Sequence, residues 1–289
     1  MRPYIELLRP HQFVKNLFVF LPVFFAREAT NADKLLDTAL AFVAFCCAAG
    51  AVYVFNDWRD CEDDKLHPLK KLRPLASGEV KSGPALALMA AMLGIALALS
   101  LLTVPDLLPV LAAYLVFNLA YSMGVKQIAI VDVMIVALGF VLRLLGGALA
   151  ADVNLSKWII IVTFLGALFI ALAKRRDDQV IYSQTGAKTR KSVDGYNVEF
   201  LNISMVIMAA VLIVAYIMYT VSDRAVLVSG SENTYITAFF VLLGIMRYLQ
   251  ITLVKQASGA PSRIVLRDRF LQLTVLGWLL TFTWILYVD

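Results

Sequence analysis

The sequence predicts an all-α, polytopic membrane protein in which nine transmembrane helices form one bundle. Hydrophobic residues make up 61% of the 289-residue chain, and charged residues only 16%. This composition is too apolar for a water-soluble domain, and the chain is too long for a single membrane anchor. The apolar residues also gather in runs that approach the about 20 residues that a helix needs to cross a bilayer.

The apolar runs follow one another along the whole chain, and we assign residues 1–289 to one domain. The first ten residues carry acidic and basic side chains and lack the cleavage pattern of a signal peptide, so we interpret them as mature sequence. Cys46 and Cys47 are neighbours in one apolar run and Cys61 lies in a loop, a spacing that does not indicate disulfides or zinc. The predicted helices cover residues 12–27, 34–56, 83–104, 107–122, 129–150, 156–173, 200–221, 234–252 and 270–288.

Lysine and arginine are divided unevenly between the two sides of this predicted bundle. If the N-terminus is cytoplasmic, that side holds most of them, and the other side holds only Arg27, Lys34, Lys157 and Arg224. The positive-inside rule then places the long charged loops in the cytoplasm and the C-terminus outside. The net charge of +5 is explained by orientation and by anionic lipid, and it does not call for nucleic acid as a partner.

An acidic stretch follows the second predicted helix. Asn56, Asp60 and Asp64 recur every four residues, and Asp57 lies three residues before Asp60. This spacing puts four oxygen-bearing side chains on one face of a helix. Oxygen ligands suit Mg²⁺, which proteins often hold together with substrate phosphates. We therefore predict a Mg²⁺ site and a phosphate-bearing substrate, with a solvated charged loop as the alternative.

A basic run lies directly after the acidic stretch. It could hold anionic oxygens beside the metal, and arginine is suited to a bidentate grip on phosphate. The order of acid and base therefore predicts a diphosphate site. In the first predicted helix, Lys15 and Asn16 are further candidates, although interfacial anchoring explains a lysine there equally well. The basic run contains Lys65, His67, Lys70, Lys71 and Arg73.

Polar side chains also mark the fourth and fifth predicted helices. Tyr114, Asn118 and Tyr121 share one helical face ahead of Lys126. A polar stripe within a membrane helix is expected to face the protein interior or a cavity, although it can also serve helix packing. Asp132 and Arg143 share a face of the fifth helix, and intramembrane ionisable residues are functional candidates unless they pair to hold the bundle together.

The end of the sixth predicted helix carries a second mixed-charge cluster. It reads K-R-R-D-D-Q over residues 174–179, and a polar loop with T-G-A-K-T-R-K-S follows. Basic residues at a cytoplasmic helix end are ordinary anchors. Here they also provide phosphate-binding candidates, namely Lys174, Arg175, Lys188, Arg190 and Lys191.

The motif N-D-x-x-D-x-x-x-D at residues 56–64, in a chain with nine expected spans, resembles the UbiA superfamily of intramembrane prenyltransferases. Members of that superfamily bind a diphosphate through Mg²⁺ between two Asp-rich motifs. Here K-R-R at 174–176 takes the place where the second motif is usual. The resemblance extends along almost the whole chain, through L-R-P-H-Q-F-V-K-N at 8–16, L-S-K-W at 155–158, G-A-K-T-R-K-S at 186–192 and L-R-D-R-F-L-Q-L at 266–273.

This ordered set is similar to the branch of the superfamily that uses phosphoribosyl pyrophosphate (PRPP). The resemblance implies Mg²⁺-dependent transfer of 5-phosphoribose from PRPP to decaprenyl phosphate or a similar polyprenyl phosphate, with release of pyrophosphate. It further implies a bacterial inner-membrane enzyme that faces the cytoplasm and supplies lipid-linked arabinofuranose for cell-envelope glycans. The sequence leaves the oligomeric state open, and a homo-oligomer is compatible with it.

Two other functions remain open at this point. The first is a conventional prenyltransferase that moves a prenyl group from a polyprenyl diphosphate to an aromatic or glycerol-phosphate acceptor. The second is a transporter or lipid-binding protein. We assign the metal ligands to Asn56, Asp57, Asp60 and Asp64, catalysis to Asp57, Asp60, Asp64, Lys126 and Tyr121, and substrate binding to Lys15, Asn16, Lys70, Arg73, Asn118, Asp132, Arg143, Lys174, Arg175, Lys188, Arg190 and Lys191.

Overall fold

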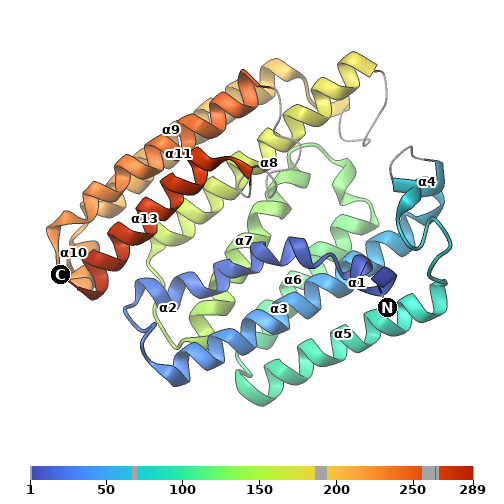
Figure 1. The fold of residues 1–289 in the computed structure, drawn as a ribbon, viewed down its shortest axis with the longest axis horizontal. Helices are drawn as coiled ribbons and strands as arrows, with labels where there is room; N and C mark the ends of the chain where they lie inside the picture. The colour runs from blue at the N-terminus through green and yellow to red at the C-terminus, as the bar shows by residue number, and fades with distance from the viewer. Residues whose placement is uncertain (1, 67–69, 186–193, 256–263, 265–266, 289) are drawn as a thin grey trace. The chain divides into compact units, whose positions relative to one another are not determined.

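The computed structural model describes residues 2–66, 70–185, 194–255, 264 and 267–288. Every long regular element in these residues is a helix, and no strand occurs among them, so the predicted all-α class is confirmed. The α-helices are labelled in Figure 1. In chain order the helices are α1 (Arg2–Leu8), η1 (Pro10–Phe20), α2 (Leu21–Phe25), α3 (Ala32–Arg59), α4 (Cys61–Leu66), η2 (Lys70–Leu72), α5 (Ser82–Thr103), α6 (Leu107–Met123), η3 (Val125–Gln127), α7 (Val131–Ala150), α8 (Lys157–Thr185), α9 (Val198–Thr220), α10 (Asp223–Ser229), η5 (Glu232–Ile236), α11 (Thr237–Leu253) and α13 (Arg269–Tyr287).

Within the described residues, 7 helices are long and apolar enough to cross a membrane, and α6, with 17 residues, is a shorter apolar helix. The structure differs most from the prediction over residues 12–27, where one membrane-spanning helix was expected. This stretch is formed by the 3₁₀ helix η1 followed by the five-residue α2. Pro22 in α2 has no backbone N–H to donate, which interrupts regular α-helical bonding near the junction. The predicted count of nine helices is therefore not confirmed.

Contacts group the chain into two compact units. Unit 1 comprises residues 1–24, 28–126 and 142–154, and unit 2 comprises residues 25–27, 127–141 and 155–289. Helix α7 contributes its first half to unit 2 and its second half to unit 1. The assignment of all residues to one domain stays a prediction.

Each unit has its own apolar core. In unit 1, α3 packs along α5 and α6 (Figure 1), and Phe45 and Leu111 are among the side chains that fill the core. In unit 2, α8 packs along α9, and α11 packs along α13 (Figure 1). Phe169, Met205 and Tyr248 lie in that second core. Helix α8 continues past the expected end at residue 173, because its charged C-terminal turns find partners within unit 2.

A close approach of two backbones in unit 1 gives a first testable prediction. A Cβ at Gly147 would lie 1.9 Å from the carbonyl oxygen of Val19, so alanine would force α7 and η1 apart. We expect Gly147→Ala to lower the free energy of unfolding by about 3 kcal/mol, as overpacking in a tight core does. The midpoint of thermal unfolding in detergent measures the change. Gly94→Ala is the matched control, because its Cβ meets no atom within 4 Å. Equal midpoints for the two variants would contradict this packing.

Candidate active site

The acidic stretch crosses the junction between α3 and α4 in unit 1. Helix α3 ends at Arg59, and Asp60 caps it with φ −89° and ψ 7°. Helical hydrogen bonding nevertheless continues, because Asp60 N donates to Asn56 O at 2.9 Å and Asp64 N donates to Asp60 O at 2.8 Å. The predicted four-residue spacing is thus kept through the junction. Asp57 and Asp64 are 2% and 3% exposed, so they are buried carboxylates at a polar helix end.

Two carboxylates of the stretch meet at one cationic nitrogen. Arg73 Nη1 lies 3.0 Å from Asp57 Oδ1 and 2.6 Å from Asp64 Oδ2. Arg9 Nη2 donates to the same Asp57 oxygen, and Lys70 Nζ lies 4.0 Å from Asp64 Oδ1. Arg73 and Lys70 were predicted from sequence as phosphate-binding residues, and the structure places both beside the acidic side chains.

The other two predicted metal ligands meet at Lys126. Its Nζ lies 2.8 and 2.6 Å from the two oxygens of Asp60 and 3.5 Å from Asn56 Oδ1. Lys126 reaches this position because α6 ends at Met123 and is capped by Gly124, whose φ of 145° lies outside the range that L side chains favour. The short helix η3 then carries the lysine.

The donor set fits a hard cation. Asp57 and Asp64 already converge on one positively charged nitrogen, and carboxylate and amide oxygens are the ligands that Mg²⁺ prefers. Among the residues that the structure describes, no group of three or more acidic, His or Cys side chains forms a ready metal cage. Arginine and lysine instead balance the carboxylates in two pairs, so the convergence of all four ligands on one ion stays a prediction.

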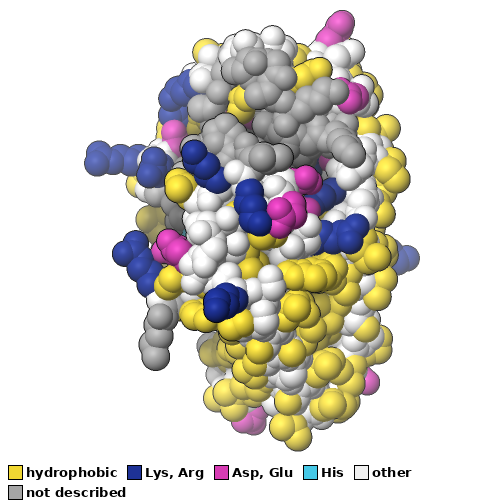
Figure 2. Space-filling view, turned by 90° about the vertical axis from the view of Figure 1, so that its right-hand side faces the viewer, with side chains coloured by type: hydrophobic (Ala, Val, Ile, Leu, Met, Phe, Trp, Pro, Cys, Tyr) yellow, Lys and Arg dark blue, Asp and Glu magenta, His cyan; other side chains and the backbone are white. Residues whose placement is uncertain are grey.

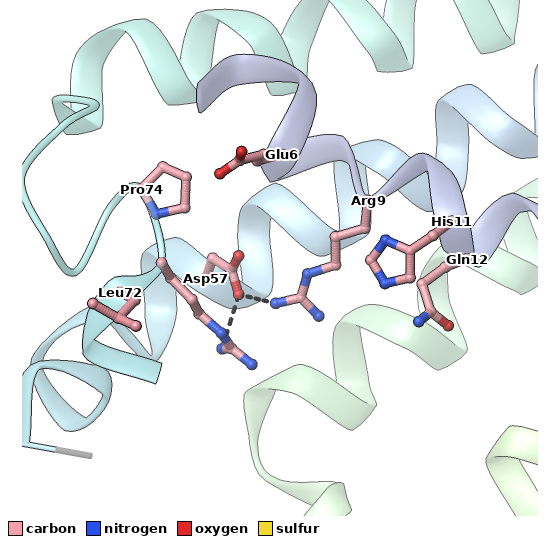
Figure 3. A pocket seen from close by; sticks show the side chains of 8 residues that line it. Glu6, Arg9, His11, Gln12, Asp57, Leu72 and Pro74 are labelled. Atoms are coloured by element: carbon pink, nitrogen blue, oxygen red, sulfur yellow. Dashed lines mark hydrogen bonds and ion pairs between the residues drawn. The ribbon is translucent and has the colours of Figure 1, made fainter. Parts of the chain in front are cut away.

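A cavity opens beside Asp57 in the same unit. It has a volume of about 380 Å³, and its lining is mostly polar or charged. Figure 3 shows Arg9 and Asp57 facing each other, with His11 and Gln12 next to Arg9. Arg9 was read from sequence only as part of the opening motif, and its role is the main feature that sequence reasoning missed. What sets Arg9 apart is its backbone conformation, which is left-handed, with φ 52° and ψ 58°.

Asn16 and Arg143, both predicted as substrate-binding residues, meet inside unit 1. Arg143 Nε donates to Asn16 Oδ1 at 2.6 Å, and Arg143 Nη2 donates to Tyr114 OH at 2.9 Å. Asn16 Nδ2 lies 3.1 Å from Cys46 Sγ. These contacts favour the alternative in which intramembrane polar residues hold the bundle together, and a role in substrate binding stays a prediction. The amide of Asn118 donates to the Tyr114 carbonyl on its own helix, at 2.8 Å.

Asp132 belongs to a separate buried group in unit 2. Its carboxylate accepts hydrogen bonds from Arg175 Nε and, at 2.7 Å, from Tyr196 OH. Arg175 Nη1 also pairs with Asp178 at 3.1 Å. Burial, followed by the hydrogen bond with Asp132, raises the pKa of Tyr196 above its usual range, so Tyr196 stays a donor. Sequence reasoning missed Tyr196, because its contact with Asp132 joins residues 64 positions apart.

The remaining candidates are distributed as follows. Lys15 lies on η1, Tyr121 on α6 and Lys174 on α8, and all three are partly exposed. Lys188, Arg190 and Lys191 lie outside the described residues. On the face drawn in Figure 2, positively and negatively charged side chains lie next to one another above a broad hydrophobic area.

The chain is similar to known proteins along almost its whole length. A family model described as the UbiA prenyltransferase family matches residues 16–286. A protein of Mycolicibacterium smegmatis, named decaprenyl-phosphate phosphoribosyltransferase, is 35% identical over 95% of this chain and 89% of its own length. A protein of the same name from Corynebacterium glutamicum is 32% identical over 98% of this chain and 86% of its own. The solved structure of a UbiA homologue from Archaeoglobus fulgidus bound to DMAPP and Mg²⁺ has a TM-score of 0.74 at 18% identity, covering 99% of both chains.

Proposed function

This chain belongs to the UbiA prenyltransferase family. From its similarity to relatives named decaprenyl-phosphate phosphoribosyltransferase, we propose that it transfers 5-phosphoribose from PRPP to a polyprenyl phosphate such as decaprenyl phosphate. It is an integral-membrane transferase. The products are polyprenyl-phosphoryl-5-phosphoribose and pyrophosphate. We place the enzyme in a bacterial inner membrane with its site toward the cytoplasm, where it supplies lipid-linked arabinofuranose for cell-envelope glycans.

The observation that carries this proposal is the alternation of acid and base at one end of unit 1. Asp57, Asp60 and Asp64 are each in contact with an arginine or a lysine. A diphosphate bound through a metal needs the carboxylates, whereas the additional phosphates of PRPP and of the lipid need cations nearby. The relatives named for phosphoribosyl transfer support the choice of donor, since they align with almost the whole chain.

Four residues would hold Mg²⁺, which supplies Lewis-acid stabilisation of the charge on the leaving pyrophosphate. They are Asn56, Asp57, Asp60 and Asp64. Around them, Arg73, Lys70 and Lys126 exchange carboxylate oxygens for phosphate oxygens when the donor binds. Tyr121, on the helix that precedes Lys126, adds a polar contact to the same end of α6. We further propose substrate contacts for Lys15, Asn16, Asn118, Asp132, Arg143, Lys174, Arg175, Lys188, Arg190 and Lys191.

The transfer itself needs little proton chemistry. An ionised oxygen of the lipid phosphate attacks the anomeric carbon, and the bond from that carbon to pyrophosphate breaks as the new C–O bond forms. No strong general base is required, because the nucleophile already carries its charge. The protein positions the two substrates and stabilises developing charge. Both effects lower the activation barrier strongly when the charged and hydrogen-bonding groups of the protein are already in place before the reaction.

The test uses purified protein with Mg²⁺, a polyprenyl phosphate and PRPP that is radiolabelled in the ribose. We expect label in the organic phase after extraction, and we expect EDTA to abolish it. If the lipid phase stays unlabelled while the protein consumes a polyprenyl diphosphate in the presence of an aromatic acceptor, the chain is a conventional prenyltransferase. If neither substrate is turned over although lipid still binds, a non-catalytic lipid-binding role is favoured.

A further inference from the structure

The open cavity beside Asp57 is lined by residues from α1, η1, α3 and the segment that begins with η2. Its lining includes Arg9, His11, Gln12 and Arg73, whereas Leu72 and Pro74 are its apolar members. A volume of about 380 Å³ lies at the lower end of the range for small-molecule sites, so it suits a phosphate group and part of a sugar. Among the described lining residues, the one acid besides Asp57 is Glu6, which pairs with Arg2 at 3.1 Å and is half exposed.

Arg9 makes two contacts at this cavity. Its Nη2 donates to Asp57, and its guanidinium lies 5.4 Å from the centre of the Tyr53 ring. A guanidinium carries five N–H donors in a planar fork. Among the described residues, the polar contact of Arg9 uses only Nη2, and Arg9 is one of the residues that line the cavity. Arg73 likewise uses Nη1 for its carboxylates.

Two arginines on one small cavity indicate an anionic ligand. Arginine forks match the oxygens of a phosphate and bind them in a bidentate way. Bringing a phosphate between Arg9 and Arg73 also adds negative charge where two cations now share one oxygen of Asp57. His11 and Gln12 add further hydrogen-bonding groups on the same wall (Figure 3).

The position of the cavity distinguishes between the two substrates. Asp57 belongs both to the cavity and to the acidic stretch that we assign to the diphosphate. A donor that carries a diphosphate and a separate phosphate on one ribose needs two adjacent anion-binding sites. The lipid acceptor instead needs an apolar path for its tail, and the lining of this cavity is predominantly polar.

We propose that this cavity binds the 5-phosphate of the phosphoribosyl donor, with Arg9 and His11 as the residues that determine donor specificity. The proposal rests on the proposed function and deepens it. It gives Arg9 a role in substrate selection that goes beyond its contact with Asp57. A donor without the 5-phosphate then loses these contacts and is discriminated against.

The first experiment measures kcat/KM for PRPP and for ribose 1-diphosphate, which lacks the 5-phosphate. We expect Arg9→Gln to lower the ratio of the two values by about 10- to 100-fold, since a hydrogen bond to a charged group is lost. His11→Ala, a change at an exposed residue, lowers the ratio by a smaller factor. Arg59→Gln removes an exposed positive charge from the end of α3 and serves as the control with an unchanged ratio.

The ratio separates selection from mere positioning. If Arg9 serves only to orient Asp57, both donors lose rate equally and the ratio stays constant, which overturns the proposal. If the KM for polyprenyl phosphate rises while the ratio is unchanged, the cavity holds the lipid phosphate and the assignment to the donor is wrong. A wild-type protein that never labels lipid from PRPP refutes the proposed function itself, and the donor assignment falls with it.

A second measurement does not depend on turnover. Binding of ribose 5-phosphate is followed by calorimetry in EDTA, with ribose as the uncharged control. We expect the wild-type protein and Arg59→Gln to bind ribose 5-phosphate, and Arg9→Gln to bind it at least about tenfold more weakly. Unchanged thermal midpoints confirm that the variants are folded. Equal binding of ribose and ribose 5-phosphate by the wild-type protein would refute a phosphate site here.

Discussion

Asp60→Ala is expected to lower kcat/KM for phosphoribosyl transfer by about 10²- to 10³-fold, the usual cost of removing one preorganised electrostatic group. Both oxygens of Asp60 hold the ammonium of Lys126, and Asp60 is one of the proposed metal ligands. Its loss therefore removes a ligand and releases a cation at the same time. The measurement is the initial rate of label transfer from PRPP to lipid at saturating Mg²⁺.

Asp63→Ala is the matched control for this effect. Asp63 lies in the same acidic stretch and carries the same charge, but its side chain is exposed. We expect its rate to stay within about twofold of the wild type, as for most surface changes. Similar losses in both variants would mean that the total negative charge of the stretch matters and that the position of Asp60 does not.

The pairing of Asp60 with Lys126 can be tested in the same assay. Lys126→Met is expected to reduce the rate, and the double variant Asp60→Ala/Lys126→Met is expected to be little worse than Asp60→Ala alone. Residues that act as a unit show such non-additive losses. Independent, additive effects would indicate that Lys126 and Asp60 serve different steps.

The second large effect concerns stability. Asp132→Ala is expected to lower the free energy of unfolding by about 3–5 kcal/mol, because removing the most deeply buried partner of Arg175 leaves its charge poorly compensated. Asp132 is 0% exposed and Arg175 is 3% exposed, so water does not take over the lost contact. Tyr196 loses its acceptor as well. The midpoint of thermal or SDS-induced unfolding measures the change.

Two further variants test this interpretation. Asp178→Ala removes the more exposed carboxylate of Arg175 and is expected to cost less stability than Asp132→Ala, because Asp178 is the partner nearer to solvent. The double variant Asp132→Ala/Arg175→Met is expected to recover much of the stability lost in Asp132→Ala, because no buried charge remains uncompensated. If Asp132→Ala unfolds like the wild type but loses activity, Asp132 contacts substrate and the structural role is wrong.

Much of the helical pattern was predictable, because the length and hydropathy of an apolar run are local properties. The expected span at 34–56 lies within α3, and the one at 200–221 nearly coincides with α9. The failures are equally local in cause. Residues 12–27 are apolar enough for a span, but hydropathy does not show that Pro22 interrupts α-helical hydrogen bonding there. Hydropathy also ends the sixth predicted span at residue 173, whereas α8 continues beyond it because its polar residues are stabilised by contacts within unit 2.

The amino-acid sequence alone determined the membrane class, the family and the acidic face at residues 56–64, since composition, ordered motifs and four-residue spacing are written along the chain. Only the tertiary structure decided which charges meet. Arg9 contacts Asp57 across 48 positions, and Arg175 contacts Asp132 across 43. Many cations in this chain are chemically able to pair with either carboxylate. Packing of segments that are distant in the sequence decides which of these cations contact each carboxylate, and no local pattern encodes those contacts.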